Sequence, residues 1–273
     1  MTDFSRYIIA TDMDGTFLNT DGKFVERNVK AVERFQAGGG LFTFSTGRVH
    51  LNLRAAVGEP AELINAPCVM SNGAYLYDFS REKAMEQSLM AEQDVRELVE
   101  VIRQSYTHVC FRASTVDALR VERTDGLLAK DLARYDTGAV KLSPIGSWPV
   151  HDWYKIVFRA EADEILRIRN ELTAHFGDRF SYTASGARFL EVQAPGVNKA
   201  TGLEKLRRSC GGDRILIACG DYENDMEMLR AADHAFCPAN AMDAVKGVCK
   251  RTLCHCNDGL LADIVELLER GEI

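Results

Sequence analysis

Residues 7–16 (YIIATDMDGT) constrain the fold of this chain more than any other stretch, because an apolar run there ends in two carboxylates. A continuous run rich in β-branched residues is typical of a strand buried on both faces of a parallel sheet. The run brings Asp12 and Asp14 to the point where the chain turns at Gly15. In an open α/β sheet, ligands bind at the carboxyl ends of the strands. We therefore expect a central strand with a functional site at its end.

The spacing of Asp12 and Asp14 limits what that site does. Two carboxylates held this close oppose each other's ionisation unless a cation lies between them. The pair therefore indicates either a metal site or one carboxyl that stays protonated and serves as an acid. The alternative is an ordinary surface turn, since Asp and Gly are common turn residues.

The rest of the chain alternates apolar runs with helical patterns, which favours an α/β fold. The glycines of residues 38–40 close a helix and precede a strand, so we interpret them as a helix C-cap rather than a phosphate loop. We expect a Rossmann-like, doubly wound parallel sheet. Its further strands lie near residues 41–45, 67–70, 215–219 and 235–237, and its helices near 25–35, 199–206, 226–229 and 261–268.

A second module interrupts this core. Residues 82–189 carry strand patterns near 109–112 and 154–158, helical patterns near 95–102 and 165–172, and most of a hairpin that turns at Ser185-Gly186. A segment of this length is enough for a small inserted domain. We therefore divide the chain into a core of residues 1–81 and 190–273 and an inserted α/β domain of residues 82–189. The polar stretch 124–147 matches no pattern that we can assign.

Charge and length exclude several classes of protein. The formal net charge of −7 argues against a nucleic-acid partner, because duplex binding needs a basic surface. Apolar runs fall short of the ~20 residues of a membrane helix, and the first residues lack the pattern of a signal peptide. We expect a cytoplasmic protein without a membrane or nucleic-acid partner, and the sequence does not indicate an oligomeric state.

The eight cysteines do not suggest a disulfide scaffold. Several lie in apolar, strand-like runs, where a free cysteine behaves as a small buried hydrophobe. Cys249, Cys254, His255 and Cys256 are soft ligand types, but they lack the paired spacing of a structural zinc site. A packed terminal strand and loop is the alternative that we favour for them.

Polar residues follow four predicted element boundaries. Asp12 and Asp14 follow the first strand, and Ser45-Thr46-Gly47-Arg48 follow the second. Residues 220–225 (GDYEND) follow the strand predicted at 215–219, and Lys199 opens a helix. A lysine in the first turn opposes the helix macrodipole, so Lys199 is either solvated or held there to meet negative charge. Carboxylates without thiol or imidazole partners select Mg²⁺, and a hydroxyl and an ammonium beside it suit a phosphoryl group. The set indicates phosphoryl transfer.

In order and spacing, these motifs resemble those of the haloacid dehalogenase superfamily, and within it the Cof-like branch of sugar-phosphate phosphatases. The resemblance extends along nearly the whole chain. It implies that Asp12 is the nucleophile that forms an aspartyl-phosphate, and that Asp14 first protonates the leaving alcohol and then activates water. It also implies that Mg²⁺ is held by the Asp12 carboxylate, the Asp14 backbone carbonyl and Asp221. The inserted domain is where this branch carries its substrate-selecting cap.

The same resemblance assigns the remaining site residues. The Thr46 hydroxyl and neighbouring amides, including that of Gly47, would bind the phosphoryl group together with Lys199. Arg48 directly follows this motif and would contribute to the same cradle. Asn224 would bind phosphate. Supporting roles fall to Asp225 and Asn72, and Asn257-Asp258-Gly259 also matches the branch.

The expected activity is the Mg²⁺-dependent hydrolysis of a small phosphorylated metabolite, with a sugar phosphate as the first choice. A phosphomutase on the same fold and a non-catalytic phospho-ligand binding protein are the alternatives. A signalling receiver domain also uses aspartates, Thr, Lys and Mg²⁺, but it is about half this length. Its phosphorylated aspartate lies on a later strand than its acidic pair, whereas here the Asp-x-Asp motif comes on the first strand. Several residues of the inserted segment could face a substrate, although each is more typical of a packed or surface position: Arg112, Arg123, His151, Trp153, Arg159 and Arg188.

Overall fold

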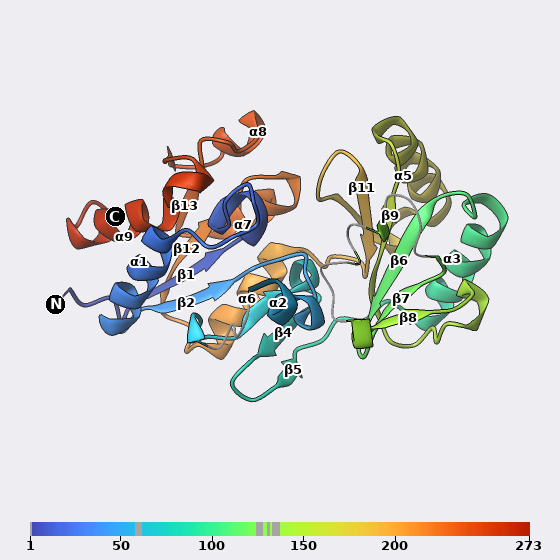
Figure 1. The fold of residues 1–273 in the computed structure, drawn as a ribbon, viewed down its shortest axis with the longest axis horizontal. Coiled ribbons are helices and arrows are strands. Elements are labelled where there is room, and N and C mark those ends of the chain that lie inside the picture. The colour runs from blue at the N-terminus through green and yellow to red at the C-terminus, as the bar shows by residue number, and fades with distance from the viewer. Residues whose placement is uncertain (1, 58–61, 124–127, 130–131, 133–136) are drawn as a thin grey trace. The chain divides into compact units, whose positions relative to one another are not determined.

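The computed structural model describes residues 2–57, 62–123, 128–129, 132 and 137–273 (Figure 1). Two compact units make up this part of the chain. The first contains the described residues of Met1–Gly47, Val57–Glu86 and Asn198–Ile273, and the second those of Arg48–Ala56 and Gln87–Val197. The sequence-based division at residues 82 and 189 into a core and a cap stays a prediction, because compactness alone does not establish what each unit does.

The first unit is built on a parallel sheet with the strand order β14-β13-β12-β1-β2. The central strand β1 (Tyr7–Thr11) pairs with β12 (Ile215–Cys219) on one side and with β2 (Leu41–Phe44) on the other. Beyond β12 lie β13 (His234–Cys237) and β14 (Arg251–Thr252). The predicted doubly wound α/β core is confirmed, with β1 as an interior strand of the sheet between β12 and β2.

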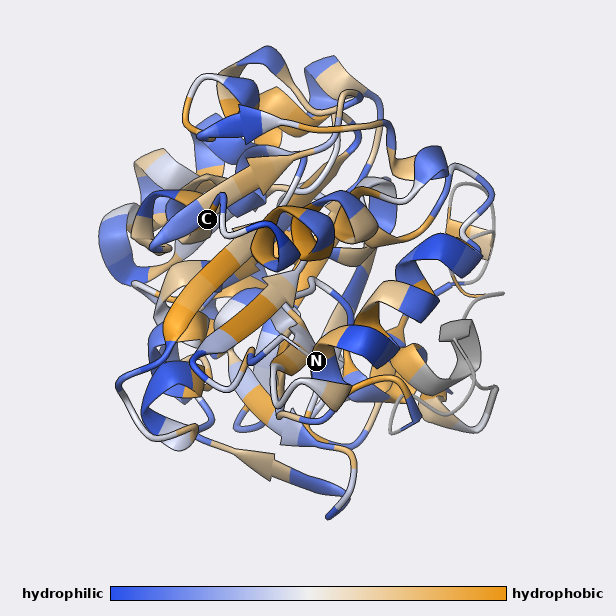
Figure 2. Cartoon of the chain, turned by 90° about the vertical axis from the view of Figure 1, so that its left-hand side faces the viewer, coloured by the Kyte–Doolittle hydropathy of each residue, from blue (hydrophilic) through white to orange (hydrophobic). Residues whose placement is uncertain are grey.

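Helices bury both faces of this sheet, which explains why β1 is apolar without alternation. On one face, Ile8 and Ala10 belong to a cluster with residues of α6 (Lys199–Ser209), α7 (Met226–Ala231) and α8 (Asp243–Lys246). On the other, α1 (Glu26–Ala37) packs against α9 (Leu260–Glu269) and against β2. Figure 2 shows hydrophobic colours on the strands of this unit and hydrophilic colours on the surrounding loops and helix surfaces.

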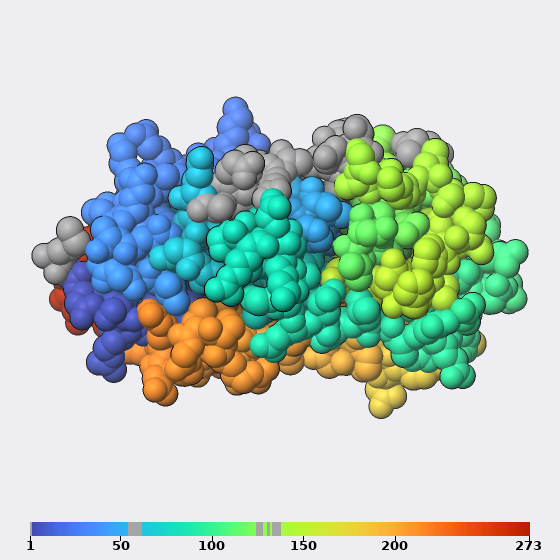
Figure 3. Space-filling model, turned by 90° about the horizontal axis from the view of Figure 1, so that it is seen from below, coloured from blue at the N-terminus to red at the C-terminus, as the bar shows by residue number. Residues whose placement is uncertain are grey.

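A hairpin sheet adjoins α6 in the same unit. It consists of β3 (Cys68–Met70), β4 (Tyr75–Asp78) and β5 (Lys83–Met85), and a bridge from Ser45 to Val69 joins β3 to the end of β2. Figure 3 shows the teal residues of this hairpin beside the orange residues of α6. The two elements approach closely because both contribute a glycine. A Cβ atom on Gly202 would lie 2.3 Å from Val69 Cγ1 and 2.7 Å from Gly73 Cα.

The second unit has a mostly antiparallel sheet with the order β10-β11-β9-β6-β7-β8. Two amphipathic helices, α3 (Glu92–Ser105) and α5 (Ala162–Phe176), each bury one apolar stripe. A short helix α2 (His50–Val57) is grouped largely with this unit. The strands are β6 (Cys110–Thr115), β7 (Leu119–Val121), β8 (Val140–Leu142), β9 (Trp153–Arg159), β10 (Ser181–Ala184) and β11 (Phe189–Gln193).

Most predicted elements are present, including the helix end at Gly38 and the hairpin that turns at Ser185-Gly186. The short strands β7 and β8 were not predicted, since three residues carry no readable periodicity. Of the stretch 124–147, residues 124–127, 130–131 and 133–136 lie outside the described residues. Within the part of the chain that the structure describes, no helix is long and apolar enough to cross a bilayer.

The close approach of α6 to the hairpin yields a stability prediction. Replacing an interior helical glycine by alanine usually favours the helix by about 1 kcal/mol. At Gly202 we expect the opposite sign, because the added methyl group overlaps Val69 and Gly73 and overpacking costs about 1–3 kcal/mol. Gly202→Ala should therefore lower the free energy of unfolding measured by urea titration.

Gly247→Ala is the matched control. Unlike Gly202, which lies within α6, Gly247 directly follows the helix α8; its φ is −67°, and the nearest atom to a new Cβ would be 3.4 Å away. This variant should be close to neutral. If Gly202→Ala were as stable as wild type, the tight helix–hairpin contact would be wrong.

Candidate active site at the carboxyl ends of the central strands

The parallel sheet brings the predicted carboxylates together. Asp12 follows β1 directly, and Asp14 lies in the turn η1 (Met13–Phe17). Asp221 follows the neighbouring strand β12, and Asp225 lies in the turn η7 (Glu223–Asp225). Because β1 and β12 pair in parallel register up to Thr11 and Cys219, their ends meet at one edge of the sheet.

Lys199 is fully buried and pairs with two of these carboxylates. Its Nζ lies 2.6 Å from Asp12 Oδ1 and 2.6 Å from Asp225 Oδ1. The helix α6 can begin at this lysine because Asn198 caps it, accepting a hydrogen bond from the Thr201 backbone amide. Of the two interpretations that the sequence left open, the ion-paired one is confirmed and the solvated one is wrong.

Burial opposes the charged form of Lys199, but the two carboxylates outweigh this effect and raise its pKa. The ammonium group is therefore charged at neutral pH. Removing a partner from a buried ion pair leaves an uncompensated charge, which is strongly unfavourable. The pairing thus holds Asp12, Asp225 and the first turn of α6 in a fixed arrangement.

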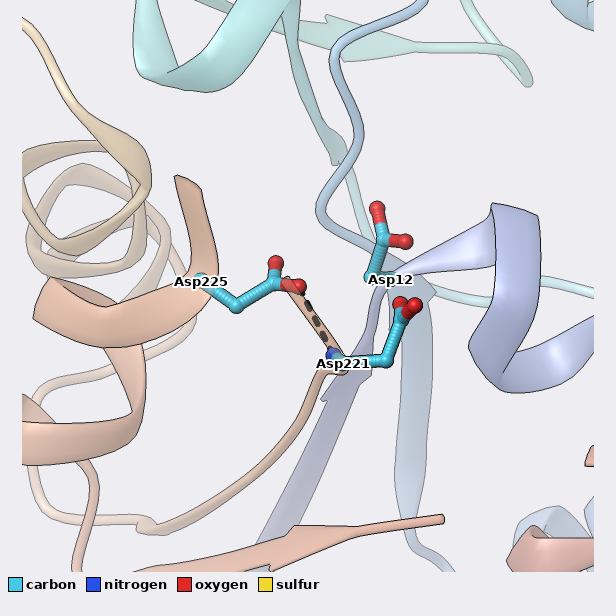
Figure 4. A group of neighbouring side chains, drawn as sticks. All are labelled: Asp12, Asp221 and Asp225. Atoms are coloured by element: carbon cyan, nitrogen blue, oxygen red, sulfur yellow. Dashed lines mark hydrogen bonds between the residues drawn. The ribbon is translucent and has the colours of Figure 1, made fainter. Parts of the chain in front are cut away.

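Asp12, Asp221 and Asp225 form an acidic group in which one carboxylate oxygen of each residue lies within 4.8 Å of the other two (Figure 4). Asp225 uses both oxygens in hydrogen bonds: Oδ1 accepts from Lys199, and Oδ2 accepts from the backbone amides of Asp221 and Tyr222. Asp12 and Asp221 accept side-chain hydrogen bonds only through Oδ1, within the described residues. Asp12 and Asp221 thus suit a hard cation such as Mg²⁺, and Asp225 supports them.

Burial, together with the crowding of negative charge, shifts the pKa values of this group. Burial, and to a lesser extent the neighbouring carboxylates, raise the pKa of Asp12 well above its usual range, although Lys199 acts in the opposite direction. Burial, followed by the charge of Asp225, raises the pKa of Asp221 to about 7. A bound cation would offset both shifts, because it favours the charged form of each carboxylate. The donor set therefore fits the Mg²⁺ that the sequence predicts.

The turn η1 lies directly against Asp221. Gly15 has φ of +80°, and a Cβ there would lie 2.6 Å from Asp221 Oδ2, so only glycine fits. The next residue, Thr16, donates a hydrogen bond from its hydroxyl to Asp221 Oδ1 at 2.8 Å. Asp14 is exposed on this turn, and its charge adds to the pKa elevation of Asp12 and Asp221.

Thr46 and Asn224 are linked through Asn72. The Asn72 backbone amide donates to the Thr46 carbonyl at 3.0 Å, and the Asn224 side-chain amide donates to Asn72 Oδ1 at 3.3 Å. Ser71 and Asn72 have φ of 52° and 54° and are buried, an unfavourable conformation for residues with side chains. Residues keep such a strained backbone conformation only where the surrounding contacts enforce it, and these residues are common at functional sites.

Gly47 and Arg48 fall on either side of the division between the units. Gly47 ends the first segment of the first unit, directly after Thr46. Arg48 belongs to the second unit, where its guanidinium donates to Asn52 Oδ1 at 3.3 Å. Arg48 is therefore not among the residues that the first unit itself brings together.

The cysteine and histidine residues near the C-terminus do not gather around a common point. Among the described residues, the only group with metal-ligand spacing is the aspartate group. All eight cysteines are free thiols. The loop that carries Cys254, His255 and Cys256 instead forms backbone hydrogen bonds with the segment after β13, including one from Ala239 to the Cys254 carbonyl.

Two polar contacts at this edge are not evident from the sequence. Thr16 stands in the first motif, but nothing in the pattern indicates that its hydroxyl bonds to a residue 205 positions away. Asn240, whose side chain donates to the Gly15 carbonyl at 2.7 Å, lies in a loop without any motif that we singled out. Both contacts depend on tertiary structure alone.

The elevated pKa of Asp221 predicts how stability depends on pH in metal-free protein. Its ordinary pKa is 3.8 and its folded value is about 7, so the protonated carboxyl favours the folded state below both values. This contribution is lost as the pH rises toward 7. We expect Asp221→Asn, which stays neutral, to match wild type at about pH 4 and to exceed its free energy of unfolding at about pH 8. The difference should be of the order of 2 kcal/mol, since one pKa unit corresponds to about 1.4 kcal/mol and coupled groups share the shift.

Denaturant titrations in the presence of a chelator measure this difference. Asp213→Asn, at an exposed position, is the control; because it retains Asp221, it should follow the pH profile of wild type. Parallel pH profiles for wild type and Asp221→Asn would contradict the electrostatic description.

Comparison with known proteins agrees with this geometry. Residues 9–264 match the family of haloacid dehalogenase-like hydrolases. A Bacillus subtilis protein named 5-amino-6-(5-phospho-D-ribitylamino)uracil phosphatase is 27% identical over 249 residues, covering 90% of this chain and 91% of the relative. An Escherichia coli protein named HMP-PP phosphatase is 29% identical over 244 residues, covering 88% of this chain and 86% of the relative.

Solved structures share the fold. A haloacid dehalogenase-like hydrolase from Bacteroides thetaiotaomicron has a TM-score of 0.82 at 20% identity, with 96% of this chain and 99% of that chain covered. A haloacid dehalogenase-like hydrolase from B. subtilis has a TM-score of 0.83 at 19% identity, with the same coverage. The match over nearly the whole chain shows that the protein belongs to the haloacid dehalogenase-like hydrolase family, which confirms the resemblance to this family and its Cof-like branch.

Proposed function

We propose that this protein is a Mg²⁺-dependent phosphatase that hydrolyses a small phosphorylated metabolite through an aspartyl-phosphate on Asp12. The observation that carries the proposal is the position of Asp12. Its carboxylate lies at the end of the central strand, 2.6 Å from a buried ammonium group and within the acidic group that it forms with Asp221. A carboxylate is a weak nucleophile, and it becomes effective where positive charge neutralises the phosphate that it attacks.

In this mechanism Asp12 Oδ2 attacks phosphorus while Oδ1 stays bonded to Lys199. Asp14 protonates the leaving alcohol and then, as a carboxylate, removes a proton from the water that hydrolyses the aspartyl-phosphate. Exposure of Asp14 on the turn η1 leaves its carboxyl accessible to both partners. One side chain can serve as acid and then as base, because the first step leaves it deprotonated.

A cation would be held by the Asp12 and Asp221 carboxylates and the Asp14 backbone carbonyl. When bound, Mg²⁺ supplies positive charge against the phosphoryl oxygens. Asp225 would not be a ligand in this assignment, because both of its oxygens are used by Lys199 and by two backbone amides.

The remaining predicted residues would hold the phosphoryl group. Thr46 and Lys199 supply a hydroxyl and an ammonium, and Gly47 supplies a backbone amide. Hydrogen bonds link Asn224 to Thr46 through Asn72, and they would hold these phosphate-binding residues in a fixed relative position. We also assign Arg48 to phosphate binding, as the sequence predicts.

The class of substrate is inferred from the relatives. The names of two of them specify phosphatases of phosphorylated small molecules. We propose the same class for this chain, with a sugar phosphate as one candidate, and we propose that residues 82–189 form the domain that selects among such compounds. The cytoplasmic location stays a prediction from the sequence.

The first experiment measures phosphate release from a panel of phosphorylated metabolites, with Mg²⁺ or with excess chelator. We expect release from one or a few compounds, and a rate roughly tenfold or more lower with chelator, because the cation offsets charge in the transition state. Conversion of a sugar phosphate to its isomer without phosphate release would instead favour a phosphomutase. Absence of turnover together with tight binding would favour a phospho-ligand binding protein.

Asp12→Asn tests the nucleophile. The variant keeps the shape of the side chain and its contact with Lys199, so far-ultraviolet circular dichroism should match wild type. Turnover should fall by at least about a thousandfold, as is typical when a nucleophile is removed. Asp213→Asn is the matched control and should retain full activity. An Asp12→Asn protein that still turns over substrate at a comparable rate would refute the mechanism.

A further inference from the structure

The side chain of Asn240 joins three loops at the carboxyl edge of the sheet in the first unit. Its Nδ2 donates a hydrogen bond to the Gly15 carbonyl at 2.7 Å. Its Oδ1 accepts a hydrogen bond from the Cys256 backbone amide at 3.0 Å. The three loops follow β1, β13 and β14, so one amide group links segments that are 225 and 16 residues away from it.

The turn that Asn240 holds is in contact with Asp221. Gly15 approaches Asp221 so closely that a Cβ on it would lie 2.6 Å from Oδ2, and Thr16 donates to Oδ1. Gly15 and Thr16 therefore position the Asp221 carboxylate. Asn240 binds the carbonyl oxygen of the peptide group that joins these two residues. A shift of that peptide group would move the Thr16 hydroxyl and loosen the contact at Gly15.

The segment containing Asn240 also holds the backbone of Asp221. The Met242 amide donates to the Asp221 carbonyl at 3.0 Å. Met242 thus contacts the Asp221 main chain directly, whereas Asn240 acts on the Asp221 side chain only through the turn η1. The same turn carries Asp14, whose backbone carbonyl precedes the peptide group that Asn240 binds.

We propose that Asn240 is a positioning residue for the cation site formed by Asp12, Asp14 and Asp221. This inference rests on the proposed function. The loop at Cys256 has a role in this arrangement. The Cys256 backbone amide orients the Asn240 side chain by donating to its Oδ1, so that Nδ2 of the same side chain points at the Gly15 carbonyl. Side chains that orient metal ligands in this way typically contribute 10–100-fold to metal affinity or activity.

Asn257 provides a matched control, because it joins the loop after β14 to the segment after β1 without reaching Gly15. Its Oδ1 accepts a hydrogen bond from the Thr20 backbone amide at 2.9 Å, and it lies in the turn η8 (Cys256–Asp258) next to Cys256. Asn240 and Asn257 are both exposed asparagines. If loop attachment in general were what matters, Asn257→Ala and Asn240→Ala would have similar effects.

The test is the affinity for Mg²⁺, measured by isothermal titration calorimetry on the full chain without substrate. We expect Asn240→Ala to weaken Mg²⁺ binding by about 10–100-fold, while Asn257→Ala stays within about threefold of wild type. Because Asn240 is exposed, its truncation opens no cavity in the core, and thermal unfolding should shift little. Asn240→Gln, which keeps the donor and the acceptor, should recover part of the affinity.

Turnover provides a second measurement with a distinct signature. At low Mg²⁺ concentration the activity of Asn240→Ala should fall, and a large excess of Mg²⁺ should restore much of it. A purely structural defect would not respond to Mg²⁺ in this way. Equal Mg²⁺ affinity for wild type and Asn240→Ala, or equal losses for Asn240→Ala and Asn257→Ala, would overturn the inference.

The calorimetry separates this inference from the proposed function. If wild type binds Mg²⁺ but hydrolyses no phosphate ester, the proposed function fails, whereas the relative affinities of the variants still decide the role of Asn240. If wild type turns over substrate but binds no Mg²⁺, the inference fails and the hydrolase activity stands.

Discussion

The buried ion pairs of Lys199 are the interaction on which the rest of this site depends. An ammonium group with no solvent exposure is stable only when opposite charges lie beside it, and Asp12 and Asp225 supply them at 2.6 Å. These three residues lie in α6, directly after β1 and in the turn after β12, which are far apart in the sequence. Folding of the parallel sheet brings them together, so the charge arrangement forms with the sheet.

Much of this arrangement could be predicted from the sequence because it rests on local patterns. An apolar run that ends in Asp12 indicates a buried strand and a site at its end, and the run that ends before Asp221 indicates a second one. The left-handed backbone at Ser71 could not be predicted, since serine seldom adopts it and nothing in the neighbouring sequence indicates it. The contacts of Asn240 and Thr16 were also inaccessible, because each depends on which loops the tertiary fold places side by side.

Glycine defines where the elements of the first unit approach most closely. Gly15 leaves room for the Asp221 carboxylate, and Gly202 leaves room for the hairpin at Val69 and Gly73. The two positions differ in kind, since Gly15 also requires positive φ whereas Gly202 lies within the helix α6. At both positions the missing side chain lets two segments approach closely. Polar groups elsewhere on those segments then come within hydrogen-bonding distance.

The formal charge of the buried group has a consequence for the order of events at the site. Three carboxylates, Asp12, Asp221 and Asp225, surround a single ammonium group, so that full ionisation leaves two negative charges in excess. A divalent cation balances this excess, and without it the carboxylates retain protons instead, as the raised pKa of Asp221 indicates. A phosphate ester that arrives first would add its own negative charge to the same place. In the proposed reaction, electroneutrality therefore favours a sequence in which the cation enters first and the anionic substrate second.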